Sequence, residues 1–217
     1  MDYGQIVEKS SYAMILTGVA TILSLLVIKA PYGRYSTDKG WGFLVPAKLA
    51  WFLMESPNLW ITLVTFILNI SNHNLSIQPN RILMMCFALH YTNRAILFPL
   101  SMKVSNPMPV SVMLMAMFYC TWNGFNQATQ LILVKAYPDE WLYDPRFIVG
   151  VVIFYWGFWV NIQSDRILVN LRKGSEASGE KKYVIPKGGW FKYVSCANYC
   201  KSIVAWHIVC SNIVPGR

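Results

Sequence analysis

The sequence predicts an all-α integral membrane protein, and two observations support this class. Of the 217 residues, 55% are hydrophobic, 15% are aromatic and only 13% are charged, which is roughly half the charged share of ordinary soluble domains. The apolar residues are also grouped in blocks, several of them long enough to cross about 30 Å of hydrocarbon as a helix. Together these features exclude an ordinary soluble domain and a disordered chain.

Six apolar segments are predicted to span the membrane. Their approximate limits are Tyr12 to Ile28, Phe43 to Ile70, Ile82 to Leu100, Val110 to Val134, Phe147 to Ile167 and, more weakly, Trp190 to Val214. We expect the first to stay as a helix and not to be removed as a signal peptide, because Asp2, Glu8 and Lys9 precede it. The second contains Pro57, which predicts a kink or break because proline lacks the backbone N–H.

The basic residues predict the orientation of these helices. The chain has 19 Lys and Arg against 10 Asp and Glu, a net charge of +9, and most of the cations follow the first, third and fifth segments. By the positive-inside rule those loops are cytosolic and the amino terminus is lumenal or external. Because the charges lie between apolar blocks, they do not indicate nucleic-acid binding. The glycosylation sequons at Asn69 and Asn74 fall near the lumenal side, and their modification is left open.

Two polar side chains are predicted to lie at similar depth in the bilayer. At 1.5 Å per residue, Glu55 lies about 18 Å and Tyr91 about 16 Å from the cytosolic side. An ionisable residue in a spanning helix is a functional candidate, and a protonated carboxyl beside a phenol offers two donors that polarise a ligand carbonyl. The alternative is that Glu55 pairs with Arg94 or Lys48 as a structural contact while Tyr91 packs.

A second polar group lies at the end of the fifth segment. Asn161, Asp165 and Arg172 fall within about 40° of one another on a helix. Such a group suits a nucleotide, with the amide and carboxylate contacting hydroxyl or amine groups and the guanidinium binding phosphate. The alternative is that Arg172 and Lys173, just before Gly174, only compensate the helix dipole.

No metal site and no common soluble cofactor motif is expected. The sequence contains no GxGxxG after a strand, Walker loop, HExxH or GxSxG. Cys196, Cys200, His207 and Cys210 are close in sequence, but they fall in an apolar segment where cysteine is a common buried residue. We expect all five cysteines to be free thiols.

Seven motifs follow one another between about residues 30 and 200. They are YGRY (32–35), VPAKLAWFLMESP (45–57), LHYTNRAILFP (89–99), NGFNQ (123–127), YPDEWLYDPRFIVG (137–150), NIQSDRILVNLRK (161–173) and YVIPKGGWFKYVSCANY (183–199). As an ordered set they resemble the steroid 5α-reductase family, the 3-oxo-5α-steroid 4-dehydrogenases of the endoplasmic reticulum. The last two motifs are the most specific.

The resemblance implies a seven-helix bundle in the endoplasmic reticulum membrane, of which residues 1–217 supply six helices as one domain. It implies that NADPH binds from the cytosol and a 4-ene-3-oxo steroid enters from the membrane lipid, with hydride passing to C5. Glu55 and Tyr91 match the pair that holds the 3-oxo group. The residues that match cofactor contacts are Asn161, Asp165, Arg172, Asn198, Tyr32 and Trp51.

The carboxy-terminal part departs from the family pattern. Lys201, Ser202 and Ala205 stand where the family has a glycine and two acids, and Met54 stands where glutamine often precedes the glutamate. We therefore interpret residues 201–217 as a divergent tail, with the last helix of the family missing. Two alternatives stay open, a truncated and catalytically silent family member, and a reductase of a polyprenal or an enoyl-CoA. Ionisable residues clustered toward one side argue against a transporter.

Overall fold

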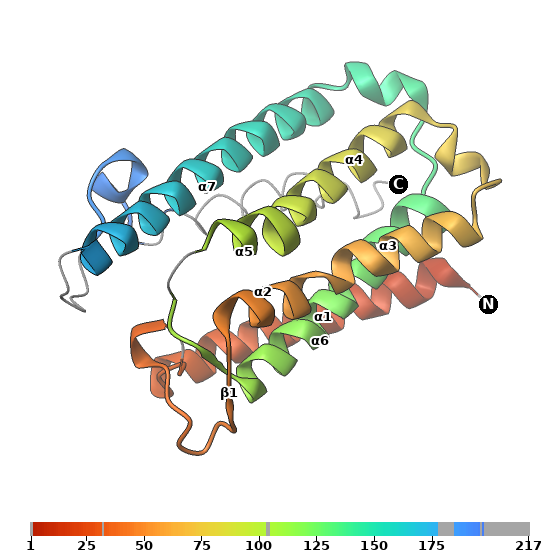
Figure 1. The fold of residues 1–217 in the computed structure, drawn as a ribbon. Helices are drawn as coiled ribbons and strands as arrows, with labels where there is room; N and C mark the ends of the chain where they lie inside the picture. Colours follow the sequence, from red (N-terminus) through yellow and green to blue (C-terminus); the bar gives the residue numbers. More distant parts are fainter. Residues whose placement is uncertain (1, 32, 103–104, 178–184, 196, 198–217) are drawn as a thin grey trace. The chain divides into compact units, whose positions relative to one another are not determined.

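The computed structural model describes residues 2–31, 33–102, 105–177, 185–195 and 197, with Arg34 and residues 172–177 described by their backbone alone. The described residues are mostly helical (Figure 1), which confirms the helical part of the predicted class. They form two compact units, one within Met1–Leu100 and Ser105–Tyr137 and the other within Ser101–Val104 and Pro138–Arg217. The α-helices are α1 (Tyr3–Val27), α2 (Ala47–Glu55), α3 (Pro57–Leu68), α4 (Gln78–Thr92), α5 (Phe98–Ser101), α6 (Val110–Thr129) and α7 (Pro145–Ala177).

Shorter elements connect or extend these helices. The 3-10 turns are η1 (Gly33–Tyr35), η2 (His73–Leu75), η5 (Asp139–Tyr143) and η6 (Gly189–Lys192), and the π-helical turns are η3 (Asn93–Leu97) and η4 (Gln130–Val134). Strands β1 (Leu44–Val45) and β2 (Met108–Pro109) pair antiparallel, with Val45 opposite Met108. This pairing explains why α2 begins at Ala47 and not at the predicted Phe43. With η4, α6 covers the predicted fourth segment from Val110 to Val134.

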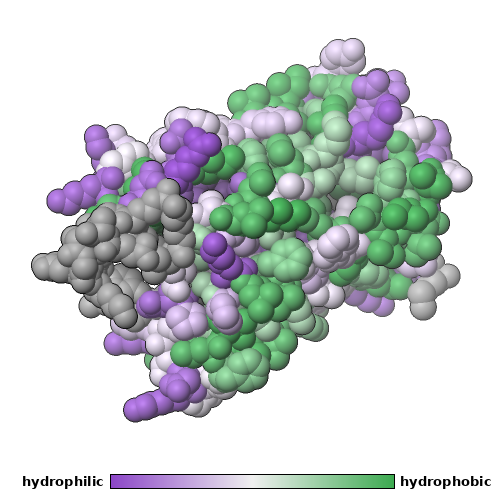
Figure 2. All heavy atoms as spheres, in the orientation of Figure 1, coloured by the Kyte–Doolittle hydropathy of each residue, from purple (hydrophilic) through white to green (hydrophobic). Residues whose placement is uncertain are grey.

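Three stretches of the described helices are long and apolar enough to cross a membrane. They are Tyr3–Val27, Ala47–Leu68 and Pro145–Leu171, and they correspond to the first, second and fifth predicted spans. Exposed apolar side chains cover much of the face shown in Figure 2, and α1 alone exposes Ile15, Leu16, Ile22 and Leu26. The count of six spans stays a prediction. Most of the sixth segment lies outside the described residues, and its first residues form the turn η6.

Helix α1 begins well before the predicted apolar segment. The Asp2 carboxylate accepts hydrogen bonds from the backbone N–H groups of Gly4 and Gln5, at 2.9 and 3.2 Å, and so caps the helix. Polar residues then continue the helix into the apolar part. One of them, Ser10, donates to Asn126 Oδ1 on α6 at 2.8 Å and accepts from Trp122 Nε1, so the polar end of α1 also attaches it to α6.

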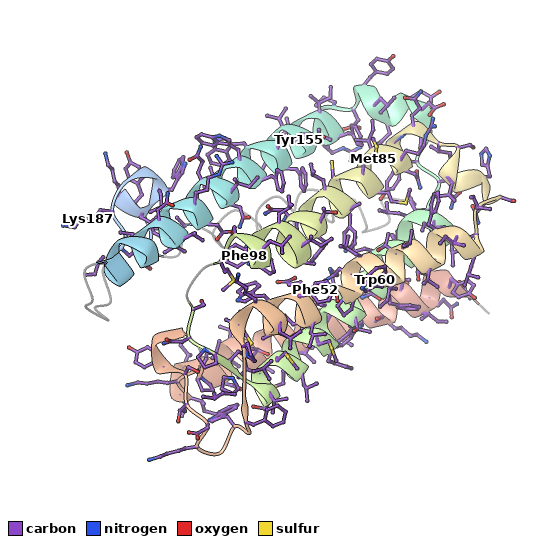
Figure 3. All side chains as sticks on the ribbon, in the orientation of Figure 1. Phe52, Trp60, Met85, Phe98, Tyr155 and Lys187 are labelled. Atoms are coloured by element: carbon purple, nitrogen blue, oxygen red, sulfur yellow. The ribbon has the colours of Figure 1, made fainter. Side chains whose placement is uncertain are left out.

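The predicted break at Pro57 is confirmed. Helix α2 ends at Glu55 and α3 begins at Pro57, while Ser56 between them keeps helical torsion angles of φ −61° and ψ −27°. Phe52 and Trp60, labelled in Figure 3, mark the two sides of the break. The backbone N–H groups of Leu59 and Trp60 both donate to the Ser56 carbonyl, at 2.9 and 3.1 Å. The Glu55 carbonyl accepts instead from the side-chain amide of Asn58 in a long hydrogen bond of 3.5 Å.

Helices α3 and α6 approach each other so closely that their backbones touch. A Cβ atom added to Gly124 would lie 3.0 Å from Asn58 Cα and 3.3 Å from the Pro57 carbonyl oxygen. Both are main-chain atoms, which cannot move aside as a flexible side chain can. Small residues at helix contacts allow this kind of approach in membrane proteins.

The second unit is built on α7. Before the helix, Asp144 Oδ1 accepts from the Arg146 backbone N–H at 2.8 Å and from Arg146 Nε at 2.9 Å. The Arg146 side chain thereby lowers the pKa of the Asp144 carboxyl. After the helix, η6 packs on α7, with the Trp190 and Trp156 ring centroids 5.3 Å apart. The helix extends ten residues beyond the predicted limit of Ile167.

We predict that Gly124→Ala destabilises the protein by about 1–3 kcal/mol, because the added methyl group overpacks a backbone contact. Thermal unfolding in detergent measures this change. Gly18→Ala on α1 is the matched control, since its Cβ would lie at an ordinary 3.5 Å from the Tyr119 hydroxyl oxygen. Equal midpoints for the two variants would contradict the close contact.

Candidate active site

Glu55 and Tyr91 contact neighbouring residues of one face of α6. Glu55 is the last residue of α2 and Tyr91 lies in the last turn of α4. Cys120 Sγ donates to Glu55 Oε2 at 3.7 Å, and Asn123 Nδ2 donates to the Tyr91 hydroxyl oxygen at 2.9 Å. Residues three apart in a helix are neighbours on its surface. The carboxyl and the phenol are therefore brought to adjacent positions by a third helix.

A chain of side-chain amides links the two groups a second time. Asn123 Nδ2 also donates to Asn58 Oδ1 at 2.9 Å, and Asn58 Nδ2 donates to the Glu55 carbonyl. Asn58 is fully buried, with 0% of its surface exposed. A buried amide lowers the free energy only when its donors and acceptors are satisfied, so these bonds fix the side-chain positions.

The ring of Tyr91 is held by aromatic neighbours on its own helix. Its centroid lies 4.6 Å from that of Phe87 and 5.0 Å from that of His90, which meets it edge-on. Both neighbours are buried. The packing restricts the ring, so the direction of the hydroxyl is set by α4 and by the bond from Asn123.

Arg94 lies within the protein and not at its surface. Only 5% of it is exposed, and its guanidinium carbon lies 4.7 Å from the ring centroids of both Trp51 and Phe98. Arg94 also interacts electrostatically with Glu55. Arg94 belongs to η3, and such π-helical turns are frequent at functional sites.

Trp51, which the resemblance matched to a cofactor contact, is part of this aromatic group. Its ring lies 5.0 Å from that of Phe98, labelled in Figure 3, in an edge-to-face arrangement. It is buried, one turn before Glu55 on α2. Trp51 thus lies on the same helix as Glu55 and contacts Arg94, which interacts electrostatically with Glu55.

The other predicted cofactor residues belong to the second unit or lie outside the described residues. Asn161 and Asp165 are buried and lie one turn apart on α7. Arg172 lies two turns further on the same helix, directly after the apolar stretch Pro145–Leu171, and only its backbone is described. Tyr32 and Asn198 are not among the described residues.

Three polar residues of the site have no role assigned from the sequence, although Asn123 opens the NGFNQ motif. Cys120 and Asn123 lie in an apolar segment, and Asn58 follows the helix-breaking proline. A polar residue in a predicted span could have indicated these side chains. Asparagine and cysteine are uncharged and common in such segments, however, so they do not stand out there.

No metal centre is found among the described residues, where no group of three or more His, Cys, Asp or Glu side chains could hold an ion. Among the described residues, neither Cys86 nor Cys120 forms a disulfide. The cysteines and His207 of the carboxy-terminal cluster lie outside the described residues.

We predict that Arg94→Lys destabilises the protein by about 1–2 kcal/mol, because lysine keeps the charge but loses the planar contact with two rings. Arg81→Lys, at an exposed position of α4, is the matched control and should leave the unfolding midpoint unchanged. An unchanged midpoint for Arg94→Lys would show that the ring contacts contribute nothing.

Comparison with known proteins agrees with the ordered motifs. A family model described as 3-oxo-5-alpha-steroid 4-dehydrogenase matches residues 106–212. The chain is 37% identical to 3-oxo-5-alpha-steroid 4-dehydrogenase 1 of Bos taurus over 202 residues, which cover 93% of this chain and 77% of that protein. It is 39% identical to steroid 5-alpha-reductase DET2 of Gossypium hirsutum, over 88% of this chain and 73% of the relative. The chain belongs to the 3-oxo-5α-steroid 4-dehydrogenase family, a family of oxidoreductases.

Proposed function

We propose that this chain reduces the 4,5 double bond of 3-oxo-4-ene steroids to 5α-steroids with NADPH. Relatives named 3-oxo-5-alpha-steroid 4-dehydrogenase and steroid 5-alpha-reductase support a reaction of this class. The observation that carries the proposal is that the Glu55 carboxyl and the Tyr91 hydroxyl both contact one face of α6. A carboxyl and a phenol held together in an apolar protein form a pair that suits one ketone oxygen.

The chemistry of the enone explains why such a pair is needed. The ketone at C3 is conjugated with the double bond, so withdrawing electrons at the oxygen makes C5 electrophilic. As C5 is reduced, negative charge develops on the ketone oxygen. Preorganised donors that meet this charge lower the barrier more than they strengthen substrate binding. We assign these donors to Tyr91 and to the protonated form of Glu55, and C4 then takes up a proton.

NADPH, when bound, supplies the hydride. Asn161 and Asp165 fit such a ligand, because a buried amide and a buried carboxylate one turn apart suit hydroxyl and amine groups of a nucleotide. Arg172 follows the apolar stretch of α7 and would meet a phosphate. Tyr32, Trp51 and Asn198 are the remaining residues that we assign to the cofactor.

We further propose where the reaction takes place. The chain would act as one domain with six spanning helices in the endoplasmic reticulum membrane, with the cofactor side facing the cytosol. A steroid partitions into lipid, so it would reach the site from the bilayer, where an apolar pocket suits it. The reaction needs neither a metal nor a nucleic acid.

The direct test is turnover by the purified chain in lipid nanodiscs. With NADPH and progesterone or testosterone, we expect the 5α-reduced steroid in equal amount to the NADPH consumed. NADPH oxidation with a polyprenal or an enoyl-CoA, and none with steroid, would assign the chain to a different substrate. Steroid binding without any product would identify it as a catalytically silent member.

We predict that Glu55→Gln lowers kcat about 100-fold and changes the KM for NADPH little, because an amide is a weaker donor to the developing charge than a carboxylic acid. Steady-state kinetics with varied NADPH measures both. Glu8→Gln, at an exposed position of α1, should leave both constants unchanged. A raised KM for NADPH with a normal kcat would contradict the role given to Glu55.

We predict the opposite pattern for Arg172→Ala, a KM for NADPH raised about tenfold or more with a nearly normal kcat at saturation. Removal of a charge-assisted phosphate contact weakens binding of the cofactor in the ground state and in the transition state alike. The matched control is Arg166→Ala, at an exposed position of the same helix. Equal effects of the two arginine variants would remove the assignment.

A further inference from the structure

We propose that Asn123 is a positioning residue that orients the hydroxyl of Tyr91 as a hydrogen-bond donor toward the substrate ketone. This inference rests on the proposed function, and it adds to the site a residue other than Glu55 and Tyr91. Asn123 acts through Tyr91, and it lies on α6, a different helix from either member of the pair.

The hydrogen bond between the Asn123 and Tyr91 side chains has a defined direction. The amide nitrogen of Asn123 has two protons, one for Asn58 Oδ1 and one for the Tyr91 oxygen, each at 2.9 Å. An amide nitrogen only donates, so the phenol oxygen is the acceptor in this bond. The phenol proton must then point away from Asn123 and toward another acceptor. In the reacting complex we assign that acceptor to the ketone oxygen.

Asn58 determines that Asn123 presents its amide nitrogen and not its oxygen. Asn58 is fully buried, and its own nitrogen donates to the Glu55 carbonyl. The Asn58 oxygen therefore faces α6 and requires a donor. If the Asn123 amide were turned over, two oxygens would face each other and a buried acceptor would lose its bond, which destabilises the protein.

The orientation of Asn58 originates at the helix break after Glu55. Proline at position 57 interrupts the backbone hydrogen bonds of the helix, and the Asn58 amide bonds to the Glu55 carbonyl there. Gly124, next to Asn123, lets α6 approach Asn58 to backbone contact. The break after Glu55 thus sets the direction of Asn58, then of Asn123, and finally of the Tyr91 hydroxyl. The positions of the Glu55 carboxyl and the Tyr91 hydroxyl therefore both depend on the backbone at this break.

The test replaces the donor by an acceptor of the same shape. In Asn123→Asp the new carboxyl only accepts where it is ionised, so kcat is compared at the high end of the pH range, where the Tyr91 proton turns toward the carboxylate and away from the ketone. We expect kcat to fall about 100-fold. Asn123→Ala, which removes the donor without adding charge, should lower kcat about tenfold. Asn126→Asp is the matched control, because Asn126 lies on the same helix and its oxygen already accepts from Ser10, and its kcat should stay within about twofold.

A double-mutant cycle separates orientation of Tyr91 from a general structural effect. In a Tyr91→Phe background the hydroxyl is absent, so we expect either Asn123 substitution to change kcat by less than about threefold. Thermal unfolding and binding of progesterone without NADPH show whether each variant is folded. Losses of equal size in both backgrounds, or a normal kcat in both Asn123 variants, would overturn the inference and leave the proposed function standing. A wild-type chain that makes no reduced steroid would overturn both.

Discussion

The break between α2 and α3 is the feature on which the rest of the site depends. A helix inside a membrane must satisfy its backbone groups within the protein, and Pro57 interrupts that pattern directly after Glu55. The Asn58 amide bonds to the Glu55 carbonyl there, and Asn58 in turn bonds to α6. The acid therefore lies at a helix end whose geometry is defined by hydrogen bonds, beside a third helix that can approach because residue 124 is glycine.

Helix α6 connects the structural and the chemical parts of this unit. On one side it bonds to α1 through Ser10 and through Tyr119, whose hydroxyl donates to the Met14 carbonyl at 2.7 Å. On another side it presents Cys120 and Asn123 to the carboxyl and the phenol. Sites held on packed helices keep their geometry better than sites on loops. The same helix that holds the unit together thus fixes the distance between the two groups that would share one oxygen.

Much of this arrangement was predictable from the sequence, and the rest failed for physical reasons. The apolar blocks predicted the class, Pro57 predicted the break, and the limits of the fourth segment match α6 with η4. Charge in an apolar segment pointed to Glu55. The roles of Asn58 and Asn123 were missed, because an amide takes its role from partners on other helices. The burial of Arg94 was not predicted for the same reason, since the rings that it contacts belong to α2 and α5. The Asp2 cap and the short β1–β2 pair were not predicted either, because both depend on local backbone geometry and not on the position of the apolar blocks.

The claim that two donors meet at a single ketone oxygen can be measured without turnover. Isotope-edited infrared difference spectroscopy with progesterone labelled by ¹⁸O at the 3-oxo position reports the stretching frequency of that bond in the bound steroid. We expect a frequency well below that of the same steroid in an apolar solvent, with part of the shift lost when either Glu55 or Tyr91 is replaced by a residue that cannot donate. A bound ketone with the frequency of the apolar solvent would contradict it.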